Sequence, residues 1–228
     1  MPRAAVGQPP NRTPWHPDSA AADRFNPAEF ANIARHEESF WWYRGMRAIQ
    51  LGVLAPYLEK RPIRRAFEGG CGTGYLARGL QRERGLPLAP MDYSAEGLRY
   101  GVAEGMERAT QGSLLDLPFA SGAFDLAMSF DVLQQFQPGE ERRALGELAR
   151  VLMPGGLLAL RVSAFHALRS RHSEYVCERQ RYTRRINRDP STPPLLSHKR
   201  RGPTSARRVQ HQITGVGGHE DAALDDEV

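Results

Sequence analysis

The spacing of apolar residues changes several times between residues 28 and 186, from helix-like to strand-like. Apolar side chains near a 3.6-residue spacing predict a helix over residues 40–58, which stops after Ala55 and Pro56 because proline has no amide hydrogen to donate. Further helices are predicted at 75–82, after the capping residue Ser94, and at 140–152. Short apolar runs predict strands at 63–67, 86–91, 108–111, 124–130 and 157–162.

Strands that alternate with helices of this length indicate an α/β fold with right-handed crossovers and a mainly parallel sheet. In such sheets a ligand binds beyond the carboxyl ends of the strands, at the point where the strand order reverses. The first predicted strand leads into Glu68 and then into glycines. We therefore expect the ligand at this turn.

Composition divides the chain into three regions. Residues 1–27 are rich in proline and poor in apolar side chains, which predicts a disordered N-terminal arm. Residues 28–186 carry nearly all of the periodic hydrophobicity and form the predicted domain. Residues 187–228 contain four prolines and no sustained period, which predicts a disordered, atypical tail.

The formal net charge of +5 is concentrated in one segment. Between Arg161 and Arg185, seven arginines stand against two glutamates, and the rest of the chain is balanced. Such a segment can attract nucleic acid, anionic substrates or a membrane surface, but it is more often a solvated helix face. We therefore predict no nucleic-acid partner.

Targeting signals and cysteine usage indicate the cellular compartment of the protein. No apolar run approaches the ~20 residues that a membrane-spanning helix needs, and the N-terminus lacks the apolar core of a signal peptide. Cys71 lies inside the glycine-rich turn and Cys177 is the only other cysteine, so no structural disulfide is expected and a reducing compartment fits. We expect a cytoplasmic protein without a membrane span.

Residues 68–74 (EGGCGTG) form a glycine-rich turn between the first strand and the next helix. The alternating glycines let a ligand lie against the backbone, and the loop amides are expected to face that ligand at the helix N-terminus. Residues 72–77 also satisfy the G-x-G-x-x-A form of dinucleotide-binding folds. In either case an acidic residue after the second strand, here Asp92, would hold ribose hydroxyls, so the turn alone does not decide which nucleoside cofactor is bound.

This turn and three further motifs together favour one cofactor. Residues 66–74, 111–119, 123–133 and 148–157 resemble, in order, the first motif, the adenine loop, the fourth-strand motif and the turn before strand five of class I S-adenosylmethionine-dependent methyltransferases. Residues 40–47 (FWWYRGMR), 170–174 and 181–185 are similar to a group of bacterial small-molecule methyltransferases of the ubiquinone/menaquinone type. The resemblance covers about residues 36–186 and leaves a nicotinamide-dependent oxidoreductase as a weak alternative.

The resemblance implies a Rossmann-like sheet of strand order 3-2-1-4-5 and S-adenosylmethionine as cofactor. It implies that Glu68 orients the methionyl ammonium, that Asp92 takes both ribose hydroxyls and that Tyr93 lies against the adenine. The implied cofactor-binding residues are Glu68, Gly70, Cys71, Gly72, Gly74, Asp92, Tyr93, Ser113, Leu114 and Ser129. Ser113 replaces a frequent aspartate of the family, so the hydrogen bond to the adenine amino group would be about 1 kcal/mol weaker.

These residues do not identify a catalytic base. Asp131, just after the fourth strand, is a candidate that could equally cap the following helix, and His172 is a candidate that is more often a surface histidine. Gln134 and Gln135 stand where relatives often carry Glu or His, and an amide cannot take a proton. We expect a small-molecule methyl acceptor and no metal, and the oligomeric state is left open.

The tail departs from the family. Relatives continue beyond the position of residue 186 with a helix and two strands that complete the sheet, whereas this chain continues with a proline-rich sequence. We therefore expect the last two strands to be missing, as after a C-terminal truncation or a frame shift, which would leave the fifth strand as an uncovered edge. An active methyltransferase is the leading hypothesis, and a truncated, non-catalytic relative that at most binds the cofactor is the alternative.

Overall fold

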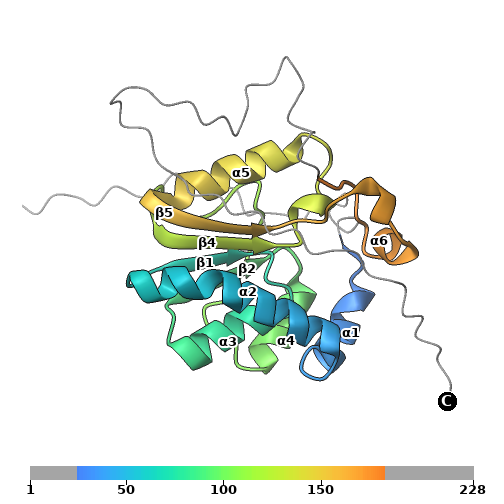
Figure 1. The fold of residues 1–228 in the computed structure, drawn as a ribbon, viewed down its shortest axis with the longest axis horizontal. Coiled ribbons are helices and arrows are strands. Elements are labelled where there is room, and N and C mark those ends of the chain that lie inside the picture. The colour runs from blue at the N-terminus through green and yellow to red at the C-terminus, as the bar shows by residue number, and fades with distance from the viewer. Residues whose placement is uncertain (1–24, 183–228) are drawn as a thin grey trace, which may run out of the picture.

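The computed structural model describes residues 25–182, which form an α/β fold (Figure 1). The strands are β1 (Ala66–Gly69), β2 (Leu88–Asp92), β3 (Thr110–Gln111), β4 (Phe124–Phe130) and β5 (Leu152–Arg161). The helices are α1 (Ala28–His36), α2 (Trp41–Lys60), α3 (Tyr75–Arg84), α4 (Ala95–Ala103), α5 (Glu140–Val151) and α6 (Arg171–Tyr175), with short 3-10 turns η2 (Leu133–Gln135) and η3 (His166–Leu168). The predicted arm up to residue 24, the last residues of the predicted domain and the whole predicted tail lie outside the described residues.

All strand pairs of the described sheet are parallel, and their order is β3-β2-β1-β4-β5. This confirms the predicted fold class and the predicted order. The order reverses between β1 and β4, so the crevice at the carboxyl ends of these central strands is the place where a ligand is expected.

Two helical layers cover the sheet, with α2, α3 and α4 on one face and α5 on the other (Figure 1). The alternation along β4 explains this arrangement, since Leu126 and Met128 pack into the core under α3 and α4, while Ala127 packs into the core under α5. From α5, Leu148 and Val151 are fully buried in the second core. Each face therefore has its own apolar core, and the site must lie at the end of the layers.

The helix predicted over 40–58 extends to Lys60, with Pro56 inside it. The sequence-based stop at Pro56 was therefore wrong. A proline in a helix interior costs about 3 kcal/mol, but Leu54 is fully buried and Tyr57 and Leu58 pack against the same core. Tertiary packing on both sides of the proline keeps the helix continuous.

The fifth strand begins earlier than its predicted start at residue 157. Leu152 already pairs with Phe124, and the register then shifts so that Leu157 pairs with Leu126. The predicted turn at 154–156 is thus a bulge within β5, where Gly155 has a φ of +77°. The predicted strand at 108–111 is shorter, with only Thr110–Gln111 paired, because Arg108 has a left-handed backbone.

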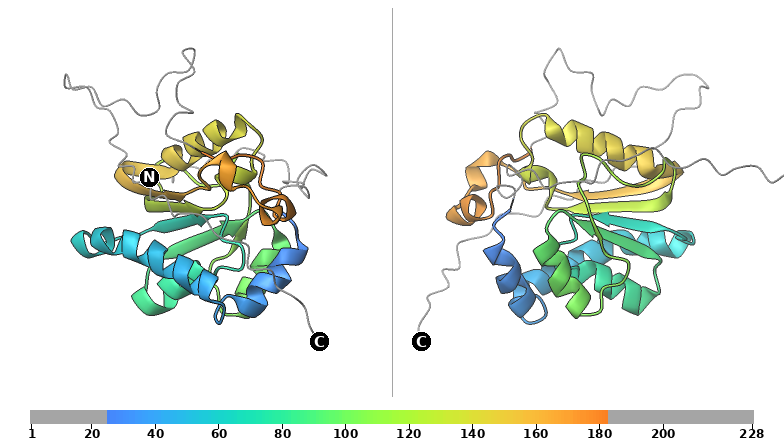
Figure 2. Two further views of the ribbon diagram at one scale, coloured as in Figure 1. Left: turned by 45° about the vertical axis from the view of Figure 1, so that its right-hand side comes forward. Right: turned by 180° about the vertical axis from the view of Figure 1, so that it is seen from behind.

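The helix α1 was not predicted at all, although Phe30 and Ile33 have helical spacing and Glu29 lies in its first turn. Both views in Figure 2 place α1 and α6 at the same end of the sheet, where the strands end. Within residues 25–182, no helix has both the length and the apolar character that crossing a membrane requires.

Candidate functional site

The glycine-rich turn after β1 has two positions, Gly70 and Gly74, that leave no room for a side chain. Gly70 has a φ of +79°, and a Cβ there would lie 2.1 Å from Cγ2 of Val132. Gly74 has a φ of +71°, and a Cβ there would lie 2.2 Å from the sulfur of Met106. Both positions therefore require glycine, for conformation and for space.

Three amides of this turn do not face a ligand site, as the sequence had suggested that they would. The N–H groups of Gly70 and Cys71 donate to the carbonyl of Met91 at 2.7 and 3.0 Å, and the N–H of Gly74 donates to the carbonyl of Cys71 at 2.8 Å. The expectation that the loop amides face a ligand is wrong for these three residues. The turn instead offers bare backbone surface, because its amides close the loop onto β2.

Asp92, the last residue of β2, joins the turn to the next helix. Its Oδ2 accepts from the N–H of Gly72 and its Oδ1 accepts from the N–H of Ser94, both at 2.7 Å. Burial raises the pKa of the Asp92 carboxyl, and the backbone N–H groups of Ser94, Gly72 and Tyr93 act in the opposite direction. Each oxygen keeps a further lone pair for a ligand hydroxyl.

Glu68 lies beneath the turn and does not line the cleft described below. It is 5% exposed, and its Oε2 has no hydrogen-bond partner among the described residues. Burial, with a smaller contribution from the charge of Asp92, raises the pKa of Glu68 to about 8. The hydroxyl of Ser129, at the other side of β1, donates to the carbonyl of Gly69 at 2.9 Å and is fully buried.

A cleft of about 380 Å³ opens at the carboxyl ends of the strands. Seven of the ten predicted cofactor-binding residues line it: Gly70, Cys71, Gly72, Asp92, Tyr93, Ser113 and Leu114. Glu68, Gly74 and Ser129 do not line it and lie behind the wall. The residues that follow β1, β2 and β3 form one side of the cleft, called here the β1–β3 side.

The opposite wall, called here the β4–β5 side, consists of Phe130, Asp131, Val132, Gln135, Phe136 and Arg161. Asp131 has a left-handed backbone with a φ of 60°. The Nε of Arg161 donates to both oxygens of Asp131 at 3.0 Å, and its Nη2 also donates to Oδ2. Asp131, a predicted candidate, therefore faces the cleft as half of an ion pair, which the sequence did not show because Arg161 is distant in the chain.

His172, the other predicted candidate, lies on α6 and does not line the cleft. Its ring is exposed, and its centroid lies 6.5 Å from the ring centroid of Tyr175. The structure therefore does not bring His172 together with Asp131.

The helices α1 and α2 supply a third wall, and sequence reasoning missed the part that α1 contributes. Phe30 is 5% exposed and its ring lies over the turn, because a Cβ on Gly72 would be 3.6 Å from it. Glu37, 1% exposed, accepts from the hydroxyl of Thr73 and from Arg78, which ties the α1–α2 junction to the glycine-rich turn. The spacing of Phe30 and Ile33 was the available signal for this wall.

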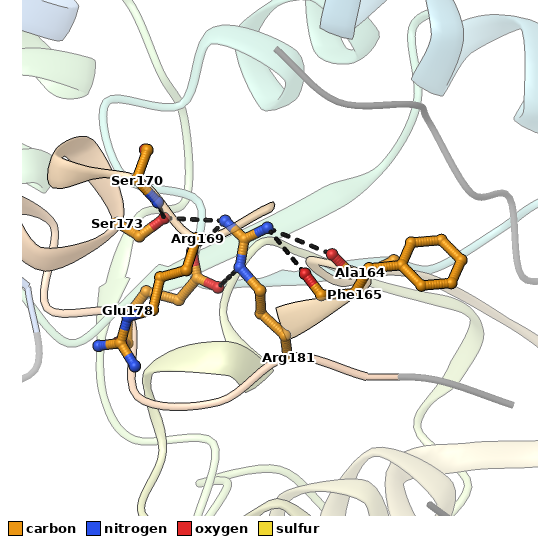
Figure 3. Close-up of polar contacts among 7 residues, drawn as sticks. All are labelled: Ala164, Phe165, Arg169, Ser170, Ser173, Glu178 and Arg181. Carbon is orange, nitrogen blue, oxygen red and sulfur yellow. Dashed lines mark hydrogen bonds and ion pairs between the residues drawn. The ribbon is translucent and has the colours of Figure 1, made fainter. Parts of the chain in front are cut away.

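The segment after β5 is held together by one half-buried arginine, Arg181 (Figure 3). Arg181 forms an ion pair with Glu178 at 2.5 Å, donates to Ser173 at 2.8 Å and donates to the carbonyl of Ala164 at 3.2 Å. Arg169 donates to the carbonyl of Glu178 at 2.9 Å. Arginines of the basic segment are thus used to hold a loop.

The same segment is attached to the loop after β4. The N–H groups of Arg179 and Gln180 donate to the carbonyl of Gln134, and the hydroxyl of Tyr182 donates to the carbonyl of Leu133. Since the neighbouring Gln135 lines the cleft, this attachment supports the β4–β5 side from behind.

Comparison with known proteins agrees with this geometry. Residues 67–160 match the family model described as "Methyltransferase domain". This segment contains the glycine-rich turn, Asp92, the loop after β3, Asp131 and most of β5. The chain contains a class I S-adenosylmethionine-dependent methyltransferase domain.

Relatives with different names share this methyltransferase domain. The chain is 35% identical over 94 residues to a malonyl-[acyl-carrier protein] O-methyltransferase of Pectobacterium atrosepticum, covering 41% of this chain and 36% of the relative. It is 38% identical over 125 residues to the demethylmenaquinone methyltransferase of Thermus thermophilus, covering 52% of each. The chain therefore spans only about a third to a half of the length of these curated relatives.

A solved structure supports the fold alone. The putative methyltransferase in a complex with the Haloferax volcanii Trm112 methyltransferase activator is 21% identical, with a TM-score of 0.50, covering 67% of this chain and 70% of that chain. Together with the family match, this agrees with the Rossmann-like sheet observed here.

The residues of the cleft fit S-adenosylmethionine, the cofactor that the methyltransferase domain implies. The turn is free of side chains where a Cβ would collide, and Asp92 is fixed by two backbone donors with acceptor capacity left over. Glu68 has an unsatisfied buried oxygen, which suits a site that receives a cationic group. No group of three or more His, Cys, Asp or Glu residues within 25–182 is arranged to hold a metal ion.

Proposed function

We propose that this protein transfers a methyl group from S-adenosylmethionine to a small-molecule acceptor in the cleft at the carboxyl ends of the strands. The observation that carries the proposal is the position of Asp92, whose carboxylate is aimed at the cleft by the N–H groups of Gly72 and Ser94. A carboxylate in this place binds a vicinal diol with two hydrogen bonds. When bound, the cofactor supplies an electrophilic methyl group on a cationic sulfur.

On the β1–β3 side, we assign Asp92 to the ribose hydroxyls and Tyr93 to the adenine face. Ser113 and Leu114 meet the adenine edge, since both line the cleft directly after β3. The backbone of Gly70, Cys71 and Gly72 carries the methionyl and ribose parts, and Gly74, which does not line the cleft, shapes the turn behind them. Glu68 and Ser129, which lie behind this wall, act on the methionyl end through the turn.

On the β4–β5 side, no residue is assigned as a general base. Both oxygens of Asp131 accept from Arg161, so Asp131 orients the guanidinium. Gln135 lines the cleft but cannot take a proton, and His172 is not in the cleft. The residues of this chain therefore contribute alignment of the acceptor with the methyl group and exclusion of water.

The small size of the acceptor and the absence of a nucleic-acid partner are also part of the proposal. Within the basic segment, Arg169 and Arg181 make internal bonds, so these two charges are not available as a surface for phosphates. Cys71 and Cys177 are both free thiols, which supports a cytoplasmic location.

The proposal is tested by calorimetric titration with S-adenosylmethionine, followed by an assay for S-adenosylhomocysteine on a panel of small acceptors. Micromolar binding and acceptor-dependent product are expected. Binding without product on every acceptor would favour the non-catalytic relative. Tight binding of NADH without binding of S-adenosylmethionine would overturn both.

A further inference from the structure

We propose that Arg161 anchors a carboxylate group of the acceptor, so that the substrate is an apolar molecule with a single negative charge. This deepens the proposed function and rests on it. The guanidinium of Arg161 belongs to the β4–β5 side of the cleft.

Only one edge of this guanidinium is used. Asp131 accepts from Nε and Nη2, whereas Nη1 is buried without a hydrogen-bond partner among residues 25–182. A guanidinium has five N–H donors, so the other edge, made of Nη1 and the second hydrogen of Nη2, remains as a planar two-donor fork. Such a fork matches the two oxygens of a carboxylate.

The arginine is held in place for such a role. The ring of Phe130 lies 5.9 Å from the Arg161 guanidinium carbon, and the Arg161 side chain is 13% exposed. Asp131 adopts its left-handed backbone immediately after β4, and its carboxylate fixes the other edge of the fork. Strained backbone of this kind is found where the position of a side chain matters.

The charges of the cleft favour a monoanion. Asp131 neutralises Arg161, and the carboxyl group of Asp92 lies on the opposite side of the cleft. A dianionic phosphate would meet this negative surrounding with twice the repulsion of a carboxylate. The carboxylate is therefore the anion that we assign.

The surroundings of Arg161 favour an apolar body on the acceptor. Apolar side chains from α2, from the end of β4 and from the segment after it line the same cleft, namely Trp42, Met46, Phe130, Val132 and Phe136. An acceptor with a carboxylate at one end and a hydrophobic portion at the other would satisfy both the fork and these side chains.

The test uses a matched pair of probes, 4-phenylbutyrate and 4-phenylbutanol, titrated into the full chain with saturating S-adenosylhomocysteine. Wild type is expected to bind the carboxylate at least about tenfold more tightly than the alcohol, the usual effect of a charge-assisted hydrogen bond. Arg161→Gln should abolish this preference and Arg161→Lys should retain part of it. Arg82→Gln, an exposed arginine on α3 away from the cleft, should behave as wild type.

A second variant covers the case in which Arg161→Gln does not fold. Asp131→Asn leaves the arginine without its counter-charge, so the preference for the carboxylate should increase. Equal binding of the two probes by wild type, or an unchanged preference in Arg161→Gln, would overturn the proposal. Titration with S-adenosylhomocysteine alone is the independent check. If S-adenosylhomocysteine does not bind, the proposed function is rejected, whereas a preference for the carboxylate probe would still support the role of Arg161.

Discussion

The two sides of the cleft are built by different means. The β1–β3 side is backbone and one carboxylate: glycines with positive φ, amides closed onto Met91, and Asp92 held by two N–H groups. The β4–β5 side is made of long side chains in ion pairs, with Arg161 on Asp131 and, behind it, Arg181 on Glu178. The first arrangement suits a ligand of fixed shape, and the second suits an acceptor that can differ between relatives by a change of side chains.

If the two sides are independent, damage behind the β4–β5 side should leave cofactor binding intact. Arg181→Met removes the partner of Glu178, which is 6% exposed, and should lower the free energy of unfolding by about 3–5 kcal/mol, because a buried charge loses its counter-charge. Urea denaturation measures the loss, and calorimetry should show an affinity for S-adenosylhomocysteine within about twofold of wild type.

The exposed Arg171 on α6 gives the matched control. Arg171→Met should change the free energy of unfolding by no more than about 0.5 kcal/mol. A parallel loss of cofactor affinity in Arg181→Met would show that the two sides act as one unit.

Gly70 is the point where the two sides touch, since its missing Cβ leaves room for Val132. Gly70→Ala should lower the free energy of unfolding by about 2–5 kcal/mol, from left-handed backbone strain and overpacking together. Gly52→Ala, on α2 with nothing within 4 Å of its Cβ, should instead be neutral or stabilising. Equal stability of both variants would contradict the steric role of Gly70.

Glu68, behind the β1–β3 side, makes the free energy of unfolding depend on pH. Its pKa of about 8 in the folded chain lies above the ordinary value of 4.5, so between these pH values the unfolded chain has lost a proton that the folded chain keeps. Stability contributed by this carboxyl is therefore full below pH 4.5 and is lost as the pH rises towards 8. Glu68→Gln should remove this decline, with a relative gain of about 1–4 kcal/mol at pH 8.

Urea denaturation at a series of pH values checks this prediction. Parallel curves for wild type and Glu68→Gln from pH 4.5 to pH 8 would show that Glu68 titrates normally. Binding of S-adenosylmethionine near pH 7 should also release a proton in wild type and not in the variant, because a nearby cation favours the charged carboxylate.

The smallest expected effect is that of a substitution of Asp92 on cofactor affinity. Asp92→Asn keeps one acceptor for the backbone but loses the charge, so the dissociation constant for S-adenosylmethionine should rise about tenfold, or about 1.4 kcal/mol. Glu104→Gln, an exposed charge at the end of α4, is the control. Unchanged affinity in Asp92→Asn would remove the main support for the proposed function.

The sequence by itself determined the β1–β3 side. Residues 68–74 and Asp92 lie close together in the chain, and the need for positive φ at Gly70 and Gly74 is expressed directly as glycine. The alternation of short apolar runs with helices predicted the parallel sheet, and the resemblance of the motifs to class I methyltransferases implied the strand order.

Only the tertiary structure decided the β4–β5 side and the third wall. Arg161 and Asp131 meet because β4 and β5 pair in parallel, which brings residues that are far apart in the chain to neighbouring strand ends. Pro56 stays helical, and Glu37 reaches Thr73 and Arg78, because packing against the core outweighs local preference. Contacts of this kind depend on where whole elements are placed, and local sequence patterns do not contain that information.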